Sequence, residues 1–252
     1  MPDALIAPIL LFLAGFVAGV LNVIAGGGSL LTLPVMIFLG LPATVANGTN
    51  RVAILLQNVG ATWSFQRKKL ISREWLLLAV PPALVGVVLG TLAAIRIGDL
   101  AFQRILAVVL VGAAVWTIWR PVEPPADGDP DPPTGARRWG YTAAFFFVGM
   151  YGGFIQAGVG FVILAVISIA GLNLIRGNAL KVTLILAFTP LALALFAMSG
   201  KVDWAMGLAL AAGNLTGAMI GVHVQVLKGH NWVRNVVTAT VVVFAIRLLF
   251  SG

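Results

Sequence analysis

Two long stretches of the sequence carry no charged residue, and they limit what the chain can fold into. They are Ala4–Asn50 and Trp139–Ile175. A helix needs about 20 apolar residues to cross the hydrocarbon core of a membrane, so each stretch is too long for one straight crossing. Glycines interrupt both stretches, Gly26–Gly28 in the first, and Gly158 and Gly160 in the second. We therefore expect a broken membrane helix in each half, a pattern typical of transporters.

The composition supports a membrane protein. Hydrophobic residues make up 60% of the chain and charged residues 10%, whereas a soluble domain carries about 25% charged residues. The net charge of +8 is scattered over the loops between apolar segments. That distribution is typical of the positive-inside rule and not of a nucleic-acid-binding protein. With no cysteine and two histidines, the chain is expected to hold no metal site and no cofactor.

A polar linker separates two halves. Residues 120–138 contain six prolines and three aspartates, so this segment cannot pack in lipid and is predicted to be a flexible cytoplasmic linker. Residues 1–119 and 139–252 are predicted to be the first and second transmembrane repeats. The predicted apolar segments are Leu5–Val23, Ser29–Leu39, Ala46–Phe65, Trp75–Ile95, Phe102–Trp119, Trp139–Ala157, Phe161–Ala170, Ala179–Met198, Trp204–Val226 and Trp232–Phe250.

The two halves are weakly similar, and the matches occur in the same order in both. This shared order of matches in the two halves indicates an internal duplication. The glycine pairs Gly86/Gly90 and Gly217/Gly221 are among the matches and predict close contacts between helices. Other matched positions include Gly19–Asn22 with Gly153–Gln156, Gly26 with Gly160, Gly40-Leu41 with Gly171-Leu172, Asn47 with Asn178, Asn50 with Lys181, and Trp75 with Trp204.

Two arrangements of the halves are compatible with these segments. If each long stretch crosses once, the halves are parallel, and the basic residues show only a weak bias to one side. If each stretch enters and returns as a helix plus a re-entrant arm, the halves are inverted. More basic residues, including Arg67–Lys69 and Arg73, then fall inside. We therefore predict an all-α polytopic membrane bundle of two homologous, inverted repeats with broken, re-entrant helices.

Gly26, Gly27, Gly28 and Ser29 form the first candidate site. A glycine run lets a helix stop and restart, and the new N-terminus presents backbone N–H groups and the positive end of its dipole to an anion. Gly160 is the counterpart in the second half. The alternative is a tight packing turn that binds no ligand.

A polar corner follows in each half. Thr49, Asn50 and Arg51 stand together in the first half, and Asn178 and Lys181 are their counterparts in the second. An amide, a hydroxyl and a guanidinium together can coordinate an oxyanion. The alternative for Arg51 is a side chain that extends to the membrane interface.

Amide side chains supply further candidates. Asn22 and Gln156 occupy matching positions, where they could cap a broken helix or contact substrate. Gln57 and Asn58 could line a cavity or form hydrogen bonds between helices. The acidic residues fall at segment ends or in the linker, whereas cation carriers usually need a carboxylate at mid-membrane. The expected substrate is therefore an anion.

These motifs resemble the TauE/SafE sulfite exporter family, also called the toluene sulfonate uptake permease group, along nearly the whole chain. The resemblance implies a multi-pass inner-membrane permease that exports sulfite or small organosulfonates. The second half departs from the pattern, because it lacks a full triple glycine and has Ser168 where Pro34 would map. The residues that carry the resemblance are Gly15–Gly19, Asn22, Gly26–Gly28, Pro34, Gly40, Pro42 and Asn47–Asn50.

We predict a secondary transporter whose small anionic substrate sits between Gly26–Ser29 and Thr49–Arg51, with Gln156 and Lys181 opposite. The predicted partners are this anion and membrane lipid, and a homodimer is left open. The alternative functions are an anion-selective channel and a permease for another oxyanion. An enzyme is disfavoured, because the sequence offers no Ser/His/Asp set, metal-ligand cluster or paired carboxylates.

Overall fold

The computed structural model describes residues 3–24, 27–119 and 130–228, and these residues form helices and no strands. The predicted all-helical fold is confirmed, and the predicted segment Trp232–Phe250 lies outside the described residues. The helices of the described residues are α1 (Asp3–Ile24), α2 (Ser29–Phe38), α3 (Ala43–Arg67), α4 (Arg73–Arg96), α5 (Asp99–Trp119), α6 (Gly135–Phe154), α7 (Val159–Ile169), α8 (Leu174–Met198) and α9 (Trp204–Lys228).

Both predicted helix breaks are present. Gly28 stands immediately before the short helix α2, and Gly158 stands immediately before the short helix α7. Gly158 has a φ of 73°, a left-handed conformation that glycine adopts without a steric penalty. The helix α6 ends at Phe154 and not at the predicted Ala157, because Ile155 is extended with φ −137° and ψ 130°.

The two short helices also end in the same way. After α2, Gly40 has a φ of 96° and Leu41 N donates to Met36 O at 3.1 Å. After α7, Gly171 has a φ of 81° and Leu172 N donates to Ile167 O at 3.4 Å. This glycine C-cap satisfies carbonyl groups at a helix end. Its occurrence at matched positions supports the predicted duplication.

The linker and α6 differ from the predicted boundaries. Gly135–Arg138 belong to the first turn of α6 and not to a linker. Before them, Pro130 O accepts a hydrogen bond from Trp75 Nε1 at 3.0 Å, which ties this segment to the start of α4. Residues 120–129 lie outside the described residues. The first turn of α6 therefore reaches beyond the apolar segment, and its basic side chains are exposed.

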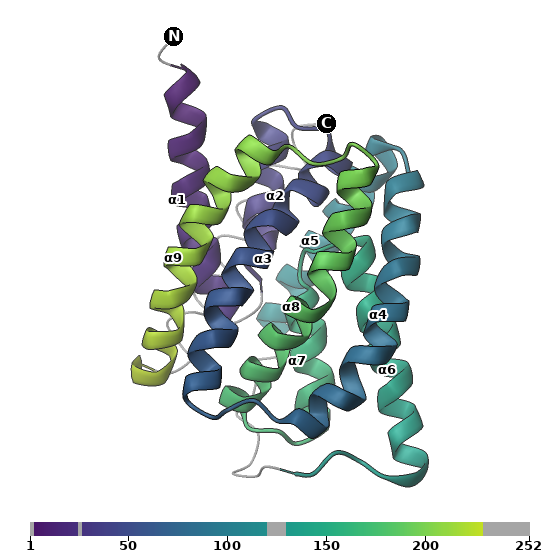
Figure 1. Cartoon of the computed structure of the whole chain (residues 1–252). Helices are drawn as coiled ribbons and strands as arrows, with labels where there is room; N and C mark the ends of the chain where they lie inside the picture. The colour runs from purple at the N-terminus through teal and green to yellow at the C-terminus, as the bar shows by residue number, and fades with distance from the viewer. Residues whose placement is uncertain (1–2, 25–26, 120–129, 229–252) are drawn as a thin grey trace.

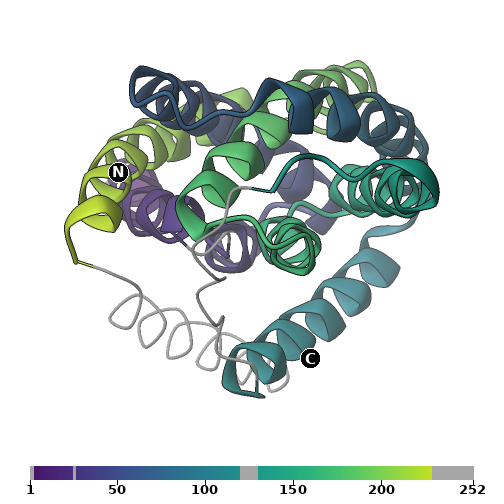
Figure 2. The same ribbon diagram turned by 90° about the horizontal axis from the view of Figure 1, so that it is seen from below.

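The helices of the two halves are interleaved (Figures 1 and 2). The helix α1 packs along α9, α6 packs along α4, and α3 and α8 lie in contact with each other. The first helix of each half therefore packs against the fourth helix of the other half. In Figure 1, α1 and α3 run downward, whereas their counterparts α6 and α8 run upward. We propose an inverted repeat, which these opposite directions support.

Glycines allow these helix pairs to approach closely. A Cβ atom at Gly86 or Gly90 of α4 would overlap the carbonyl oxygen of Phe146 or Met150 of α6. In the other pair, a Cβ atom at Gly217 of α9 would overlap a carbonyl oxygen of α1. The predicted small-residue contacts are confirmed, since the backbones meet where side chains are missing.

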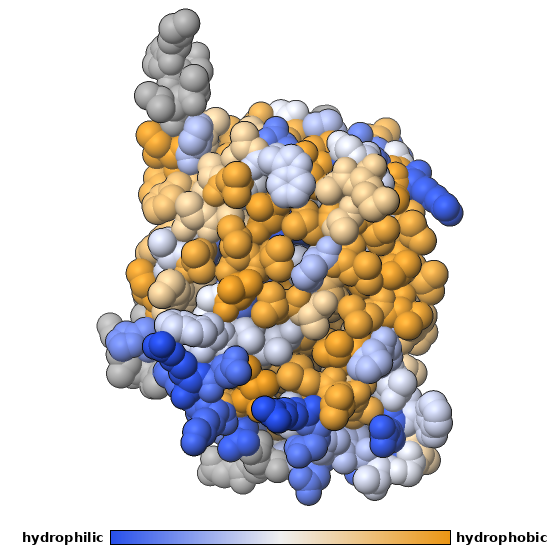
Figure 3. Space-filling view, in the orientation of Figure 1, coloured by the Kyte–Doolittle hydropathy of each residue, from blue (hydrophilic) through white to orange (hydrophobic). Residues whose placement is uncertain are grey.

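The surface has the polarity of a membrane protein. The helices α1, α4, α8 and α9 are long and apolar enough to cross a membrane. Figure 3 shows a broad apolar band on the visible face and a hydrophilic group at its lower end. The basic turn Arg67–Lys69 between α3 and α4 is exposed at this end.

Candidate functional site

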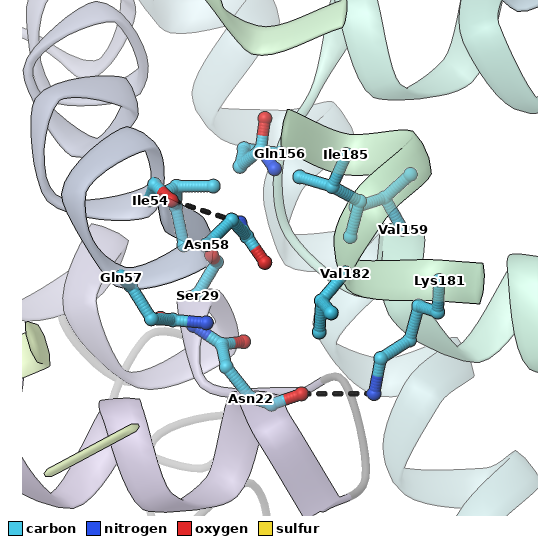
Figure 4. A pocket seen from close by; sticks show the side chains of 10 residues that line it. All are labelled: Asn22, Ser29, Ile54, Gln57, Asn58, Gln156, Val159, Lys181, Val182 and Ile185. Atoms are coloured by element: carbon cyan, nitrogen blue, oxygen red, sulfur yellow. Dashed lines mark hydrogen bonds between the residues drawn. The ribbon is translucent and has the colours of Figure 1, made fainter. Parts of the chain in front are cut away.

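The two broken helices meet at one cavity in the middle of the bundle. Ser29 is the first residue of α2, and Val159 is the first residue of α7. Both line the same cavity, although they belong to different halves (Figure 4). The N-terminus of a helix carries a partial positive charge. Two positive helix ends therefore converge on this cavity.

The cavity has one polar wall and one mostly apolar wall. Figure 4 shows the amides and the hydroxyl of the first half facing the aliphatic side chains of α7 and α8. The free volume is about 10 Å³, which is room for about one water molecule. The bundle must therefore open before an oxyanion can enter. The lining residues are Asn22, Ser29, Ile54, Gln57, Asn58, Gln156, Val159, Lys181, Val182 and Ile185.

Lys181 of α8 holds the end of α1 in the other half. Its Nζ donates to Asn22 O at 3.0 Å and to Val23 O at 3.1 Å. It also donates to Asn178 Oδ1 at 2.6 Å. These acceptors match the three donors of an ammonium group. A cation at a helix C-terminus is favourable, because the last carbonyl groups carry the negative end of the dipole.

Arg51 of α3 holds the end of α6 in the same manner. Its Nη2 donates to Gly152 O at 3.1 Å and to Gly153 O at 2.7 Å. Its Nη1 donates to Gln156 Oε1 at 3.1 Å. The guanidinium also lies over the Phe196 ring, 4.7 Å from its centroid. The side chain is fully buried, so the alternative that Arg51 extends to the membrane interface is wrong.

Each cation therefore caps the broken helix of the opposite half. The two cations differ in their relation to the cavity, because Lys181 lines it and Arg51 does not. Among the described residues they are the only buried charged side chains. The predicted basic pair is thus placed at the two breaks, with the arginine in the helix framework and the lysine at the cavity.

Asparagines fix the same breaks. Asn22 Oδ1 accepts from Gly28 N at 2.7 Å, and Asn22 Nδ2 donates to Gln57 Oε1 at 2.9 Å. Asn47 Nδ2 donates to Phe154 O at 2.9 Å. Asn22 therefore caps the broken helix, and it also lines the cavity.

Asn50 connects α3 to the start of α2. Its Nδ2 donates to Ser29 Oγ at 3.0 Å, and its Oδ1 accepts from Thr32 Oγ1 at 2.7 Å. Thr49 instead turns to the start of α9, where its Oγ1 accepts from Asp203 N at 2.8 Å. Both side chains are buried, and neither lines the cavity.

The other predicted site residues that the structure describes do not line the cavity. A Cβ atom at Gly27 would meet the Phe161 ring, and one at Gly28 would overlap the carbonyl oxygen of Ala18. These two glycines therefore permit close packing at the break. Gly160 lies in the first turn of α7, and Asn178 contacts Lys181. Gly26 lies outside the described residues.

Gln57 and Asn58 line the cavity, one of the two alternatives that the sequence left open for them, although they were not assigned to the substrate site. The signal was present in the sequence, because Asn50, Ile54 and Gln57 recur at helical spacing and form one face of α3. Val182 and Ile185 carried no such signal, since an apolar residue in an apolar helix does not indicate a cavity. Asn58 Oδ1 is buried and has no hydrogen-bond partner in the described part of the chain.

Comparison with known proteins decides the family. The sequence profile described as "Sulfite exporter TauE/SafE" matches residues 11–248. The chain belongs to this family. No solved structure matches it significantly.

Three bacterial relatives of similar length support the assignment. "Probable membrane transporter protein ORF9" of Sinorhizobium sp is 30% identical over 95% of this chain and 91% of its own. "Probable membrane transporter protein YfcA" of Escherichia coli K12 is 28% identical over 98% and 93%. "Probable membrane transporter protein" of Haemophilus influenzae is 28% identical over 90% and 89%. The TauE/SafE chain is therefore a multi-pass membrane transporter and not an enzyme.

Replacing Asn22 by alanine is expected to destabilise the protein by about 1–3 kcal/mol, because Gly28 N and Gln57 lose a buried partner. Thermal unfolding in detergent measures the change. Asn214→Leu is the control, since the Asn214 side chain is buried and has no hydrogen-bond partner in the described residues. Equal melting temperatures for the two variants would contradict the capping role of Asn22.

Proposed function

We propose that this protein is a secondary transporter that exports sulfite or small organosulfonate anions across the inner membrane. The observation that carries the proposal is the joint position of Ser29, Val159 and Lys181. Two positive helix ends and the Lys181 side chain line the same cavity. An anion gains from all three, because a partial positive charge at a helix N-terminus adds to the ammonium charge.

The hydrogen-bonding groups suit a small oxyanion. Ser29, Gln57 and Asn58 bring a hydroxyl and two amides to the cavity, and Gln156 faces them from the second half. No acidic side chain is among the described residues that line it. The description of the matching family supports sulfite as the first substrate to test and export as the direction.

The small cavity favours a carrier over a channel. An open pore needs a continuous path for its ion, whereas this cavity has room for about one water molecule. Broken helices from two halves that close around a central cavity are typical of alternating access. Conductance across a planar bilayer separates the two functions, because a channel passes ions far faster than a carrier turns over.

The direct test is exchange of labelled sulfite by the purified protein in liposomes. Labelled sulfite outside is expected to exchange with unlabelled sulfite inside, and methanesulfonate is expected to compete. Sodium and ammonium ions are expected not to compete. Exchange of a labelled cation, with no exchange of sulfite or methanesulfonate, would refute the proposal.

Asn58→Leu is expected to weaken sulfite exchange at least about tenfold, because it replaces a polar cavity wall with an apolar one, a loss of about 1.4 kcal/mol or more. The fold is expected to survive, since within the described residues the Asn58 side chain makes one hydrogen bond, to Ile54 O of its own helix. Thr62→Val is the matched control on α3, one turn further and away from the cavity. Equal exchange by the two variants would remove Asn58 from the site.

A further inference from the structure

Lys181 and Arg51 hold equivalent places but differ in one chemical property. Each caps the end of the broken helix of the opposite half with its charged group. A buried lysine can lose its proton, whereas an arginine remains charged in proteins. Lys181, which can lose its proton, lines the cavity, whereas Arg51 does not.

We propose that Lys181 is a proton-binding site that couples anion transport to proton movement, with a proton travelling in the same direction as each anion. This inference rests on the proposed anion transport. It adds the coupling ion and the residue that carries it.

The geometry around Lys181 resembles an ion site made from protein oxygens. Two backbone carbonyl groups at the end of α1 and one amide oxygen lie 2.6–3.1 Å from Nζ. Carbonyl groups at the end of a broken helix coordinate the coupling cation in other transporters. In this protein the cation is the ammonium group of Lys181, which is part of α8, so only its proton can be exchanged.

Loss of the proton loosens the contact between α8 and α1. The ammonium of Lys181 releases H⁺ to water on the side to which the cavity opens, leaving a neutral amine with two hydrogens. That amine can no longer donate to all three of its acceptors, and it loses its attraction to the negative end of α1. The protonation state of Lys181 therefore sets how firmly α8 holds the end of α1.

No carboxylate competes for this role among the described side chains. The helices packed against α8 are α1, α3, α4, α6 and α7. Among the described residues, Arg51 of α3 is the only other buried charge, and Tyr151 of α6 donates to Ala157 O at 2.6 Å. The remaining charged side chains described on α8 and these helices are exposed, namely Arg67, Arg73, Glu74, Arg96, Arg137, Arg138 and Arg176.

Anion and proton favour each other at this cavity. An anion beside Lys181 stabilises the ammonium form, and the ammonium stabilises the bound anion to the same extent. The two therefore bind and leave together. For a monovalent anion the process is electroneutral, so the membrane potential does not drive it. Export then proceeds while the outward anion gradient exceeds the inward proton gradient.

The test uses the full-length protein in liposomes that contain a pH-sensitive dye. Methanesulfonate is the first probe, because the acid is strong and its neutral form does not carry protons through lipid. Sulfite is the second, corrected with protein-free liposomes. Addition of the anion outside is expected to acidify the lumen in step with uptake of labelled anion.

The variant Lys181→Arg tests whether Lys181 is the residue that binds the transported proton. This variant keeps a fixed positive charge at the cap, and the measured quantity is the number of protons that enter per labelled anion. That ratio is expected to fall to about zero, whatever the rate of anion exchange. Should it fail to fold, Lys181→Gln takes its place, because an amide, Asn50, stands at the matched position of the first half. Lys201→Arg is the control, since Lys201 Nζ caps α4 through Ile95 O at 2.8 Å, away from the cavity.

The outcomes separate the two proposals. Labelled anion that enters wild-type liposomes without acidification overturns the coupling and leaves anion transport standing. A ratio of protons to labelled anions for Lys181→Arg or Lys181→Gln equal to that of the wild type also overturns the assignment. Absence of any anion exchange by the wild-type protein overturns both proposals.

Discussion

Replacing Arg51 by methionine is expected to destabilise the protein more than any other single change at the site and to abolish transport. The variant leaves Gly152 O and Gly153 O without their buried donor and releases Gln156 from its partner. A hydrogen bond to a charged group contributes about 1.5–3 kcal/mol, so we expect a loss of at least about 2 kcal/mol. Thermal unfolding in detergent and sulfite exchange in liposomes measure the two effects.

Arg67→Met provides the matched control on the same helix. Arg67 is exposed at the end of α3, where its guanidinium lies over Trp63 at 3.7 Å from the ring centroid. An exposed cation–π contact contributes about 0.5–1 kcal/mol, so this variant is expected to lose little stability. If both variants unfolded at the same temperature, Arg51 would not hold the end of α6.

Replacing Gly149 by leucine is expected to prevent the close packing of α4 and α6. A Cβ atom at Gly149 would overlap the carbonyl oxygen and the Cα atom of Ala83, and backbone atoms cannot move aside as a flexible side chain can. Overpacking typically costs about 1–3 kcal/mol, and a backbone overlap lies at or above the upper end of that range. The yield of monodisperse protein and its melting temperature are the measurements.

Gly140→Leu is the control on the same helix. Among the described residues, no atom outside the backbone of α6 itself lies within 4 Å of a Cβ at Gly140, so leucine is accommodated there. A helical glycine also costs about 1 kcal/mol relative to alanine, so this variant is expected to fold as well as the wild type or better. Comparable losses in both variants would indicate that the backbone contact is not what limits packing.

Much of the fold could be predicted because its signals are local. Charge-free stretches indicate membrane burial, and glycines permit the breaks before α2 and α7 at positions where other residues would be strained or too large. The residues at which the helices end were harder to predict. Ile155, for example, is apolar like its neighbours, so the sequence does not show that α6 ends before it. Asn47, which bonds to Phe154 O and Gln156 N on either side of Ile155, is far away in the chain.

The candidate site could be predicted only in part. Asn22, Ser29, Gln156 and Lys181 were predicted and line the cavity, because polar residues in apolar segments are visible in any membrane sequence. Their partners were not visible. Lys181 caps a helix 158 residues earlier in the chain, and no spacing rule connects residues so far apart.

The sequence alone determined that this chain enters the membrane, breaks two of its helices and carries basic groups near the breaks, because burial and backbone freedom depend on residue type. Only the tertiary structure decided which cation caps the end of which helix. That choice depends on how α3 and α8 pack between the halves, since a guanidinium or an ammonium group pairs with whichever carbonyl groups the packing brings within hydrogen-bonding distance.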